Sequence, residues 1–222
     1  MLSMPSAKVL VTGSAHGIGY ATARLFAIRG YLVIGVDITP STINRDNYIH
    51  IQYDLNDTEH LPDIPDINVL INNAGVQNSG HDIRTNLESL IVCTEKYGVC
   101  PSIKSIVNVA SVSAHNGAEF PEYCASKGGM LSYTKNVAKR VAKFGATCNS
   151  ISPGGVITEL NRPVMDDADK WAKIMDETPL RKWASAEEIA QWIYFMSIIN
   201  TSMTGQDIIV DNGEMINHTF IW

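Results

Sequence analysis

The chain has 222 residues, which suits one α/β domain with a full-sized core. Hydrophobic residues make up 45% of it and charged residues 18%, a composition typical of globular rather than disordered proteins. The formal net charge of -6 argues against binding to a nucleic-acid backbone, which requires clustered Lys and Arg.

The N-terminal segment and the cysteines indicate a cytoplasmic protein. A strand-like run begins at Ala7 without a charged leader and apolar stretch before it, so we expect no signal peptide. No apolar run reaches the roughly 18 residues that a transmembrane helix needs. The four cysteines form no CxxC pair and no zinc-type spacing, so we expect reduced thiols, no metal site and no membrane association.

The N-terminal half alternates short buried strands with a helix. Residues 7–12 form a β-branched apolar run that stops at Gly13, which predicts a buried parallel strand. Residues 18–29 carry a broad apolar stripe typical of a helix, and Gly30 follows at the usual C-terminal position. Further strands are expected at residues 31–36, 48–53, 67–71 and 104–109.

The C-terminal half continues the alternation. A long helix is expected at about residues 122–143, and another at 184–199, where Ser185 and Glu188 suit a capping box. Strands are expected at residues 146–151 and 206–210. Strands that alternate with helices predict a single α/β domain, a doubly wound parallel sheet of about seven strands with helices on both faces.

A glycine-rich loop joins the first strand to the first helix, and ligands of such sheets bind beyond the carboxyl ends of the strands. In residues 12–19 (TGSAHGIG), Gly13 permits a tight turn, Gly17 lets the backbone approach a pyrophosphate, and Gly19 lets the helix pack closely on the sheet. The helix N-terminus offers N–H groups to phosphate. A tight turn without a ligand would look similar, and the spacing differs from GxGxxG.

Asp37 ends the second strand, roughly 20 residues beyond the glycines, where an acid accepts hydrogen bonds from the ribose hydroxyls of a dinucleotide. A carboxylate there also repels a 2′-phosphate, which favours NAD over NADP. The alternative is that Asp37 caps a turn before Pro40. His16, in the glycine loop, is only weakly basic and leaves NADP as the less favoured cofactor.

Tyr123 and Lys127 lie four residues apart on a predicted helix, so they share a face. A lysine ammonium beside a phenol lowers the pKa of the phenol, which makes tyrosine usable as a general acid and base. Ser111 follows the fifth strand and can donate a hydrogen bond to a carbonyl oxygen. On its own, the spacing of Tyr123 and Lys127 is common on solvated helix faces. It indicates an active site here because the same chain carries the glycine-rich loop.

The ordered set of motifs resembles the short-chain dehydrogenase/reductase family over nearly the whole chain. The matching segments are TGSAHGIG, Asp37, Asp54-Leu55, NNAG, Asn86, NVAS, YCASK, ISPGGVIT and TGQDIIVDNGE. The resemblance implies a Rossmann-like fold and an NAD(P)-dependent enzyme that moves a hydride between nicotinamide and a secondary alcohol or ketone. It also implies a homo-oligomer, either a dimer or a tetramer, with a small-molecule substrate.

The resemblance assigns roles to the matching residues. Tyr123 would exchange a proton with the substrate oxygen, and Lys127 would lower the tyrosine pKa and hold the nicotinamide ribose. Ser111, for which Ser113 is an alternative, would orient the carbonyl, and Asn86 would hold a water that links Lys127 to solvent. The remaining cofactor-binding residues would be Gly13, Ser14, His16, Gly17, Ile18, Gly19, Asp37, Ile38, Asp54, Leu55, Asn73, Ala74, Gly75, Pro153, Gly154, Val156 and Thr158.

The chain also departs from the family pattern. Residues 37–48 and 56–66 are short and contain prolines that oppose a helix, and residues 75–86 are shorter than is usual, which makes the alignment of Asn86 less secure. Residues from about 158 to 183 are expected to cover the substrate. Candidates to line its pocket are His115, Asn116 and Phe120.

Two other functions fit the same residues. One is an NADPH-dependent reductase of 3-oxoacyl thioesters, which Asp37 disfavours. The other is a non-catalytic dinucleotide-binding sensor, which would keep the glycine loop but would not need the catalytic residues that this chain retains.

Overall fold

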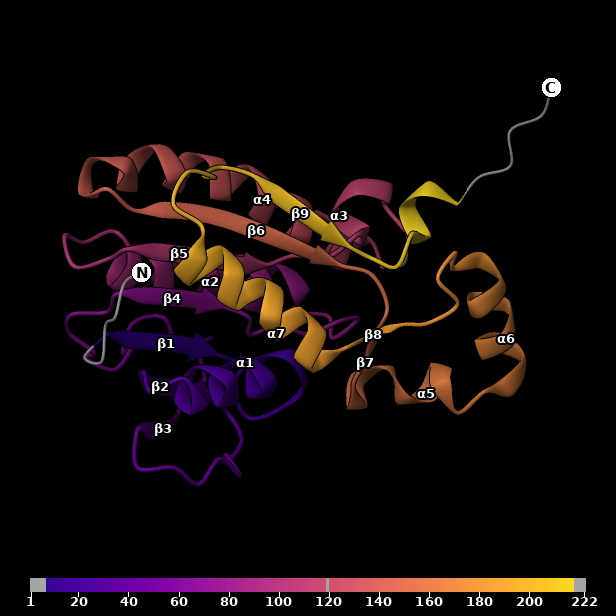
Figure 1. Cartoon of the computed structure of the whole chain (residues 1–222), viewed down its shortest axis with the longest axis horizontal. Coiled ribbons are helices and arrows are strands. Elements are labelled where there is room, and N and C mark those ends of the chain that lie inside the picture. Colours follow the sequence, from indigo (N-terminus) through magenta and orange to yellow (C-terminus); the bar gives the residue numbers. More distant parts are fainter. Residues whose placement is uncertain (1–6, 119, 218–222) are drawn as a thin grey trace.

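The structure is a computed structural model that describes residues 7–118 and 120–217. Seven parallel strands form one sheet in the spatial order β3-β2-β1-β4-β5-β6-β9 (Figure 1). The order runs outward from β1 in both directions, as in a doubly wound sheet, so the predicted fold class is confirmed. The strands are β1 (Lys8–Thr12), β2 (Leu32–Asp37), β3 (Tyr48–Gln52), β4 (Val69–Asn72), β5 (Ser105–Val109), β6 (Thr147–Pro153) and β9 (Asp207–Val210).

Helices and short helical turns connect the strands. The α-helices are α1 (Gly17–Ile28), α2 (Ser89–Cys93), α3 (Ser113–Asn116), α4 (Pro121–Val141), α5 (Arg162–Met165), α6 (Ala168–Glu177) and α7 (Ala186–Tyr194). Turns with π geometry are η1 (Arg84–Glu88), η2 (Thr94–Gly98) and η5 (Phe195–Ile199), and those with 3-10 geometry are η3 (Ala142–Phe144), η4 (Glu159–Asn161) and η6 (Glu214–Ile216). No helix of the described residues is long and apolar enough to cross a membrane.

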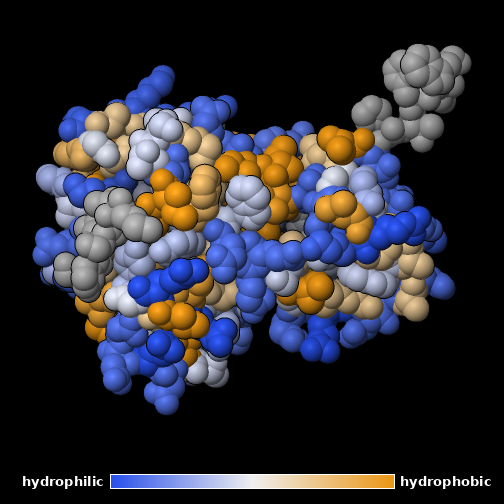
Figure 2. Space-filling view, viewed as in Figure 1, coloured by the Kyte–Doolittle hydropathy of each residue, from blue (hydrophilic) through white to orange (hydrophobic). Residues whose placement is uncertain are grey.

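Residues 158–183, which include α5 and α6, form a lobe beyond the end of the sheet toward which the strand arrows point (Figure 1). We call this segment the α5–α6 lobe. Its two ends are joined by a separate pair of parallel strands, β7 (Val156–Ile157) and β8 (Ala184–Ser185). In the space-filling view the lobe stands beside the larger body, and its surface mixes hydrophilic and hydrophobic residues (Figure 2).

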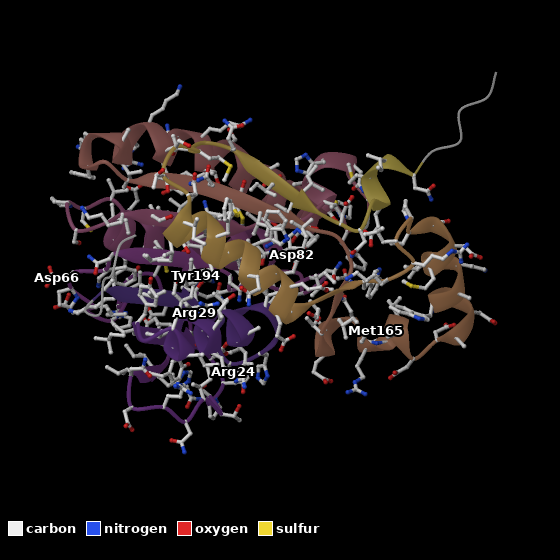
Figure 3. The ribbon with its side chains drawn as sticks, in the orientation of Figure 1. Arg24, Arg29, Asp66, Asp82, Met165 and Tyr194 are labelled. Atoms are coloured by element: carbon white, nitrogen blue, oxygen red, sulfur yellow. The ribbon has the colours of Figure 1, made fainter. Side chains whose placement is uncertain are left out.

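The core lies on both faces of the sheet, because successive side chains of a strand point to opposite sides. Val9 and Val11 of β1 pack in one cluster with residues of α1 and α7, whereas Leu10 packs in another with residues of α4 and η2. The guanidinium of Arg29, at the end of α1, lies 5.3 Å from the ring centre of Tyr194, the last residue of α7 (Figure 3). The two helices are thus held together on one face.

The predicted elements are found, with differences at their ends. Within the described residues no helix occurs in 37–48 or 56–66, as the prolines predict. The helix expected from residue 184 begins at Ala186, because residues 184–185 pair with β7 as a strand. The predicted capping box is confirmed: Ser185 accepts from the Glu188 N–H, and the Glu188 carboxylate accepts from the Ser185 N–H.

Candidate active site

A cavity of about 570 Å³ opens at the carboxyl ends of the strands, a size typical of small-molecule sites. All but three of the catalytic and cofactor-binding residues proposed from the sequence line it; the exceptions are Ser14, Gly19 and Asn86. The proposed residues that line it are Gly13, His16, Gly17, Ile18, Asp37, Ile38, Asp54, Leu55, Asn73, Ala74, Gly75, Ser111, Tyr123, Lys127, Pro153, Gly154, Val156 and Thr158. Side chains far apart in the sequence therefore meet in one place.

The glycines of the loop occupy positions that no other residue fits well. Gly13 has a φ of +65°, and a Cβ added to it would lie 2.8 Å from the Ala74 Cα. Gly17 has a φ of +49° and faces the cavity. A Cβ on Gly19 would lie only 1.9 Å from the Gly13 carbonyl oxygen, so Gly19 is needed for the close packing of α1 against the loop.

The start of α1 is arranged to receive an anion. His16 is the N-cap, and among the described residues its side chain makes no capping hydrogen bond; its Nε2 instead lies 3.0 Å from the Thr39 Oγ1. The first N–H groups of the helix are therefore not satisfied by this cap, which is the condition that suits a phosphate. The buried Ser14 faces away from the cavity, and its Oγ lies 3.2 Å from the Tyr48 hydroxyl.

Asp37 is fixed at the edge of the cavity by three hydrogen bonds. Its Oδ2 accepts from the Ala15 N–H at 2.9 Å, and its Oδ1 accepts from both the N–H and the hydroxyl of Thr39, each at 2.9 Å. The carboxylate thus ties the glycine loop to the end of β2 and places a negative charge there.

Ser111, Tyr123 and Lys127 approach the cavity from β5 and α4. Lys127 is only 4% exposed; its Nζ donates to the Val109 carbonyl at 2.8 Å and lies 5.6 Å from the ring centre of Tyr123. The Ser111 hydroxyl donates to the Ser113 Oγ at 3.2 Å and accepts from the Ser113 N–H at the same distance. The predicted shared face of Tyr123 and Lys127 is therefore present on α4.

The charge state of Lys127 is set by burial and by one carboxylate. Burial lowers the pKa of Lys127 to about 8, and Asp82 opposes this shift. Asp82 is labelled in Figure 3 and is 1% exposed; it accepts hydrogen bonds from the N–H groups of Asn78 and Ser79 and from the Ser79 hydroxyl. Burial acts to raise the pKa of Asp82, but these bonds outweigh it, and the net pKa lies below its usual range.

Asn86 lies in the π-helical turn η1 and is buried. Its side chain holds Val76 from both sides: Oδ1 accepts from the Val76 N–H at 2.8 Å, and Nδ2 donates to the Val76 carbonyl at 2.9 Å. A Cβ on Gly75 would lie 3.1 Å from the Asn86 Oδ1 and 3.5 Å from the Lys127 Nζ, so all three residues meet behind the cavity wall. That Asn86 holds a water linking Lys127 to solvent stays a prediction.

Comparison with known proteins agrees with this geometry. A family model described as enoyl-(acyl carrier protein) reductase matches residues 13–214. The chain belongs to the short-chain dehydrogenase/reductase family. It is therefore an oxidoreductase of a family that uses nicotinamide cofactors.

Relatives within the short-chain dehydrogenase/reductase family include dehydrogenases and reductases. The chain is 28% identical to a 2-dehydro-3-deoxy-D-gluconate 5-dehydrogenase of Bacillus subtilis, with 95% of each chain covered. It is 31% identical to a 3-oxoacyl-(acyl-carrier-protein) reductase of Buchnera aphidicola, with 92% of this chain and 95% of that one covered. A solved 4-hydroxyisoleucine dehydrogenase complexed with NADH is 26% identical and superposes with a TM-score of 0.85, covering 96% of this chain and 100% of that one.

Three residues that were predicted to line the substrate pocket lie outside the cavity. His115, Asn116 and Phe120 do not line the cavity, so that prediction is wrong. His115 instead packs toward the edge strand, with its Nε2 at 2.8 Å from an Asp207 carboxylate oxygen. The motif gave the position of these residues along the chain but not the direction of their side chains.

Glu214, which follows the last strand, lines the cavity and was not predicted. Glu159, Leu160 and Trp183 also line the cavity; they belong to residues 158–183, the segment expected to cover the substrate, but the sequence did not single them out. The signal that could have found Glu214 is its place just beyond the carboxyl end of β9, the same rule that identified Asp37.

Proposed function

We propose that this protein is an NAD-dependent oxidoreductase that moves a hydride between nicotinamide and a secondary alcohol or ketone. The observation that carries the proposal is that Tyr123 and Lys127 of α4 line the same cavity as the glycine loop. An acid/base pair and a dinucleotide loop at one sheet edge are the parts that such a reaction requires.

The chain's own side chains would handle the proton and the substrate oxygen. When bound, the nicotinamide accepts the hydride of the alcohol or supplies it to the ketone. Tyr123 takes the hydroxyl proton during oxidation and returns it during reduction, and the Lys127 ammonium favours the phenolate that this exchange needs. Ser111 donates a hydrogen bond to the substrate oxygen. Asn86 holds the loop at Val76 beside Lys127 and would keep a water there.

The residues around the glycine loop suit the cofactor. The N–H groups at the start of α1 would hold the pyrophosphate, the Lys127 ammonium would hold the nicotinamide ribose, and Asp37 would accept from the adenosine ribose hydroxyls. Asp54 and residues 73–75 would contact the adenosine, and residues 153–158 the nicotinamide side. The fixed negative charge of Asp37 supports NAD rather than NADP, since a 2′-phosphate would meet a carboxylate.

An NADPH-dependent reduction of 3-oxoacyl thioesters is the second candidate. The Buchnera relative, a 3-oxoacyl-(acyl-carrier-protein) reductase, favours it. The charge of Asp37 opposes it, so it ranks below the NAD-dependent reaction.

The Tyr123→Phe variant tests the proposal. Loss of the phenol proton should reduce turnover of alcohols and ketones by at least roughly 100-fold, while the Kd for NADH stays near that of the wild type. Turnover would be followed by NADH absorbance and binding by calorimetry. If Tyr123→Phe keeps most of the activity, Tyr123 has no catalytic role; if the wild type binds NADH but converts none of a broad panel of alcohols and ketones, the sensor function is favoured instead.

The cytoplasmic location and the homo-oligomer remain predictions from the sequence and the family resemblance. Light scattering at micromolar concentration would test the second, and a monomer there would contradict it.

A further inference from the structure

The α5–α6 lobe contacts the rest of the domain at both ends of residues 158–183. At its start, a Cβ added to Gly17 would lie 3.3 Å from the Thr158 Cγ2, so Thr158 lies against the glycine loop. At its end, a Cβ added to Gly155 would lie 2.0 Å from the Trp183 Cε2, so the indole packs on the Gly155 backbone. Both of these lobe residues line the cavity, and the lobe therefore forms one wall of it.

This wall presents apolar surface to the cavity. Leu160 lines the cavity and is 63% exposed, so the protein itself leaves most of this side chain uncovered. Trp183 lines the cavity as well, and its ring meets that of Trp171 edge to face with 5.0 Å between the ring centres. Val112 and Val156 add apolar side chains to the lining. Apolar surface that remains in contact with water favours a ligand that covers it.

The polar side chains beside Leu160 already have partners within the protein. The Glu159 carboxylate accepts from the Nε and Nη2 of Arg162 at 3.1 and 3.0 Å. The Asn161 Nδ2 donates to the carbonyl of Val156 at 2.8 Å. Both polar residues that flank Leu160 are thus held by the lobe or by the strand next to it, whereas Leu160 lies largely uncovered.

We propose that the substrate is a secondary alcohol or ketone with an apolar arm, an alkyl or aryl group that packs against Leu160 and Trp183. Such an arm removes its own apolar surface and that of Leu160 from water, which favours its binding. A hydroxylated arm at the same place would give up hydrogen bonds to water against an apolar surface. This inference deepens the proposed oxidoreductase function and rests on it. Leu160 is then a specificity-determining residue for the reaction.

A pair of ketones of equal size tests this inference with the whole chain and NADH. Pentan-3-one and 1,3-dihydroxyacetone differ only in that the terminal methyl groups of the first are hydroxyls in the second. We expect kcat/KM for pentan-3-one to be higher by at least roughly tenfold. Along the series propan-2-one, butan-2-one and pentan-2-one, kcat/KM should rise by roughly threefold with each added methylene.

The Leu160→Asn variant replaces the apolar side chain with a polar one of similar size. Its preference for pentan-3-one over 1,3-dihydroxyacetone should fall by roughly fivefold, and comparison with the wild type cancels the intrinsic difference in reactivity between the two ketones. Leu180→Asn is the matched control, because Leu180 belongs to the same lobe and is 65% exposed but does not line the cavity. Its preference should stay within about twofold of the wild type. Both variants should keep the wild-type Kd for NADH.

Failure of this inference is distinct from failure of the proposed function. If the protein does not bind NADH, the proposed function fails. If it binds NADH but prefers 1,3-dihydroxyacetone, or converts neither ketone at about 50 mM, far above ordinary KM values, the inference of an apolar arm is overturned. It is also overturned if Leu160→Asn leaves the preference unchanged, if Leu180→Asn lowers it equally, or if Leu160→Asn weakens NADH binding, since Leu160 would then cover the cofactor.

Discussion

The two sides of the cavity are built in different ways. On the glycine-loop side, Asp37 holds the loop through the Ala15 N–H, and the Asn73 amide donates to the carbonyls of Thr12 and Gly13 at 3.1 and 3.0 Å. On the other side, α5 and α6 of the lobe contain no buried residue. A tightly packed loop tolerates little change, whereas an exposed lobe can vary in sequence without disturbing the sheet. The first side suits a constant cofactor and the second a variable substrate.

The largest effect is expected on the glycine-loop side, at Gly19. In Gly19→Ala the new Cβ would lie 1.9 Å from the Gly13 carbonyl oxygen, so the loop or α1 must shift. We expect the free energy of unfolding to fall by about 3 kcal/mol and NADH binding to be lost. Denaturant unfolding and calorimetry measure these two effects.

Gly128→Ala is the control for Gly19→Ala. Gly128 lies in α4, and the nearest atom to an added Cβ would be 3.9 Å away. We expect Gly128→Ala to raise the free energy of unfolding by up to about 1 kcal/mol, because alanine has a higher helix propensity than glycine. Equal destabilisation by both variants would show that packing at the glycine loop is not special.

The next effect concerns cofactor choice. We expect wild-type protein to bind NADH several-fold more tightly than NADPH, and Asp37→Asn to reduce that preference by roughly tenfold, since the charge that repels a 2′-phosphate is removed. Calorimetric Kd values for both cofactors provide the measurement. A wild-type preference for NADPH would refute the role of Asp37.

A smaller effect is expected at Asp82, whose charge acts on the pKa of Lys127. An ammonium with a pKa of about 8 is mostly protonated at neutral pH and loses its proton as the pH rises through that value. The Asp82 charge raises this pKa, so Asp82→Asn should lower it, and the alkaline loss of kcat/KM should begin at a lower pH than in the wild type.

Ser79→Ala is the matched control for Asp82→Asn, because it removes one hydrogen bond to Asp82 but keeps the charge. The pH at which its kcat/KM falls on the alkaline side should remain near that of the wild type. If both variants shift this pH equally, the loop geometry and not the carboxylate charge determines the pKa of Lys127.

The smallest effect on the fold is expected in the α5–α6 lobe. Leu160 is 63% exposed but lines the cavity, so Leu160→Ala should raise the substrate KM by a few-fold. The free energy of unfolding should change by less than about 0.5 kcal/mol, as is usual for exposed positions. The Kd for NADH should stay the same as in the wild type. A large loss of stability or of NADH binding would break the contrast between the two sides of the cavity.

Local patterns in the sequence predicted most of the sheet and the residues at its strand ends. Buried parallel strands have a clear composition, and Asp37 and the glycine loop follow from the rule that ligands bind at the carboxyl ends. The start of the last long helix was misplaced because residues 184–185 pair with β7, a contact between distant segments. The direction of His115 was missed for a similar reason, since its partner Asp207 lies on a strand far along the chain.

The parallel pairing of Val156 with Ala184 and of Ile157 with Ser185 has a consequence for protein engineering. It brings the two ends of residues 158–183 side by side, so this segment is a loop that starts and finishes at the same place on the domain. The entropy of closing such a loop grows only slowly with its length. Segments of other lengths, transplanted between these two anchor points, should therefore be accommodated while the parallel sheet folds as before.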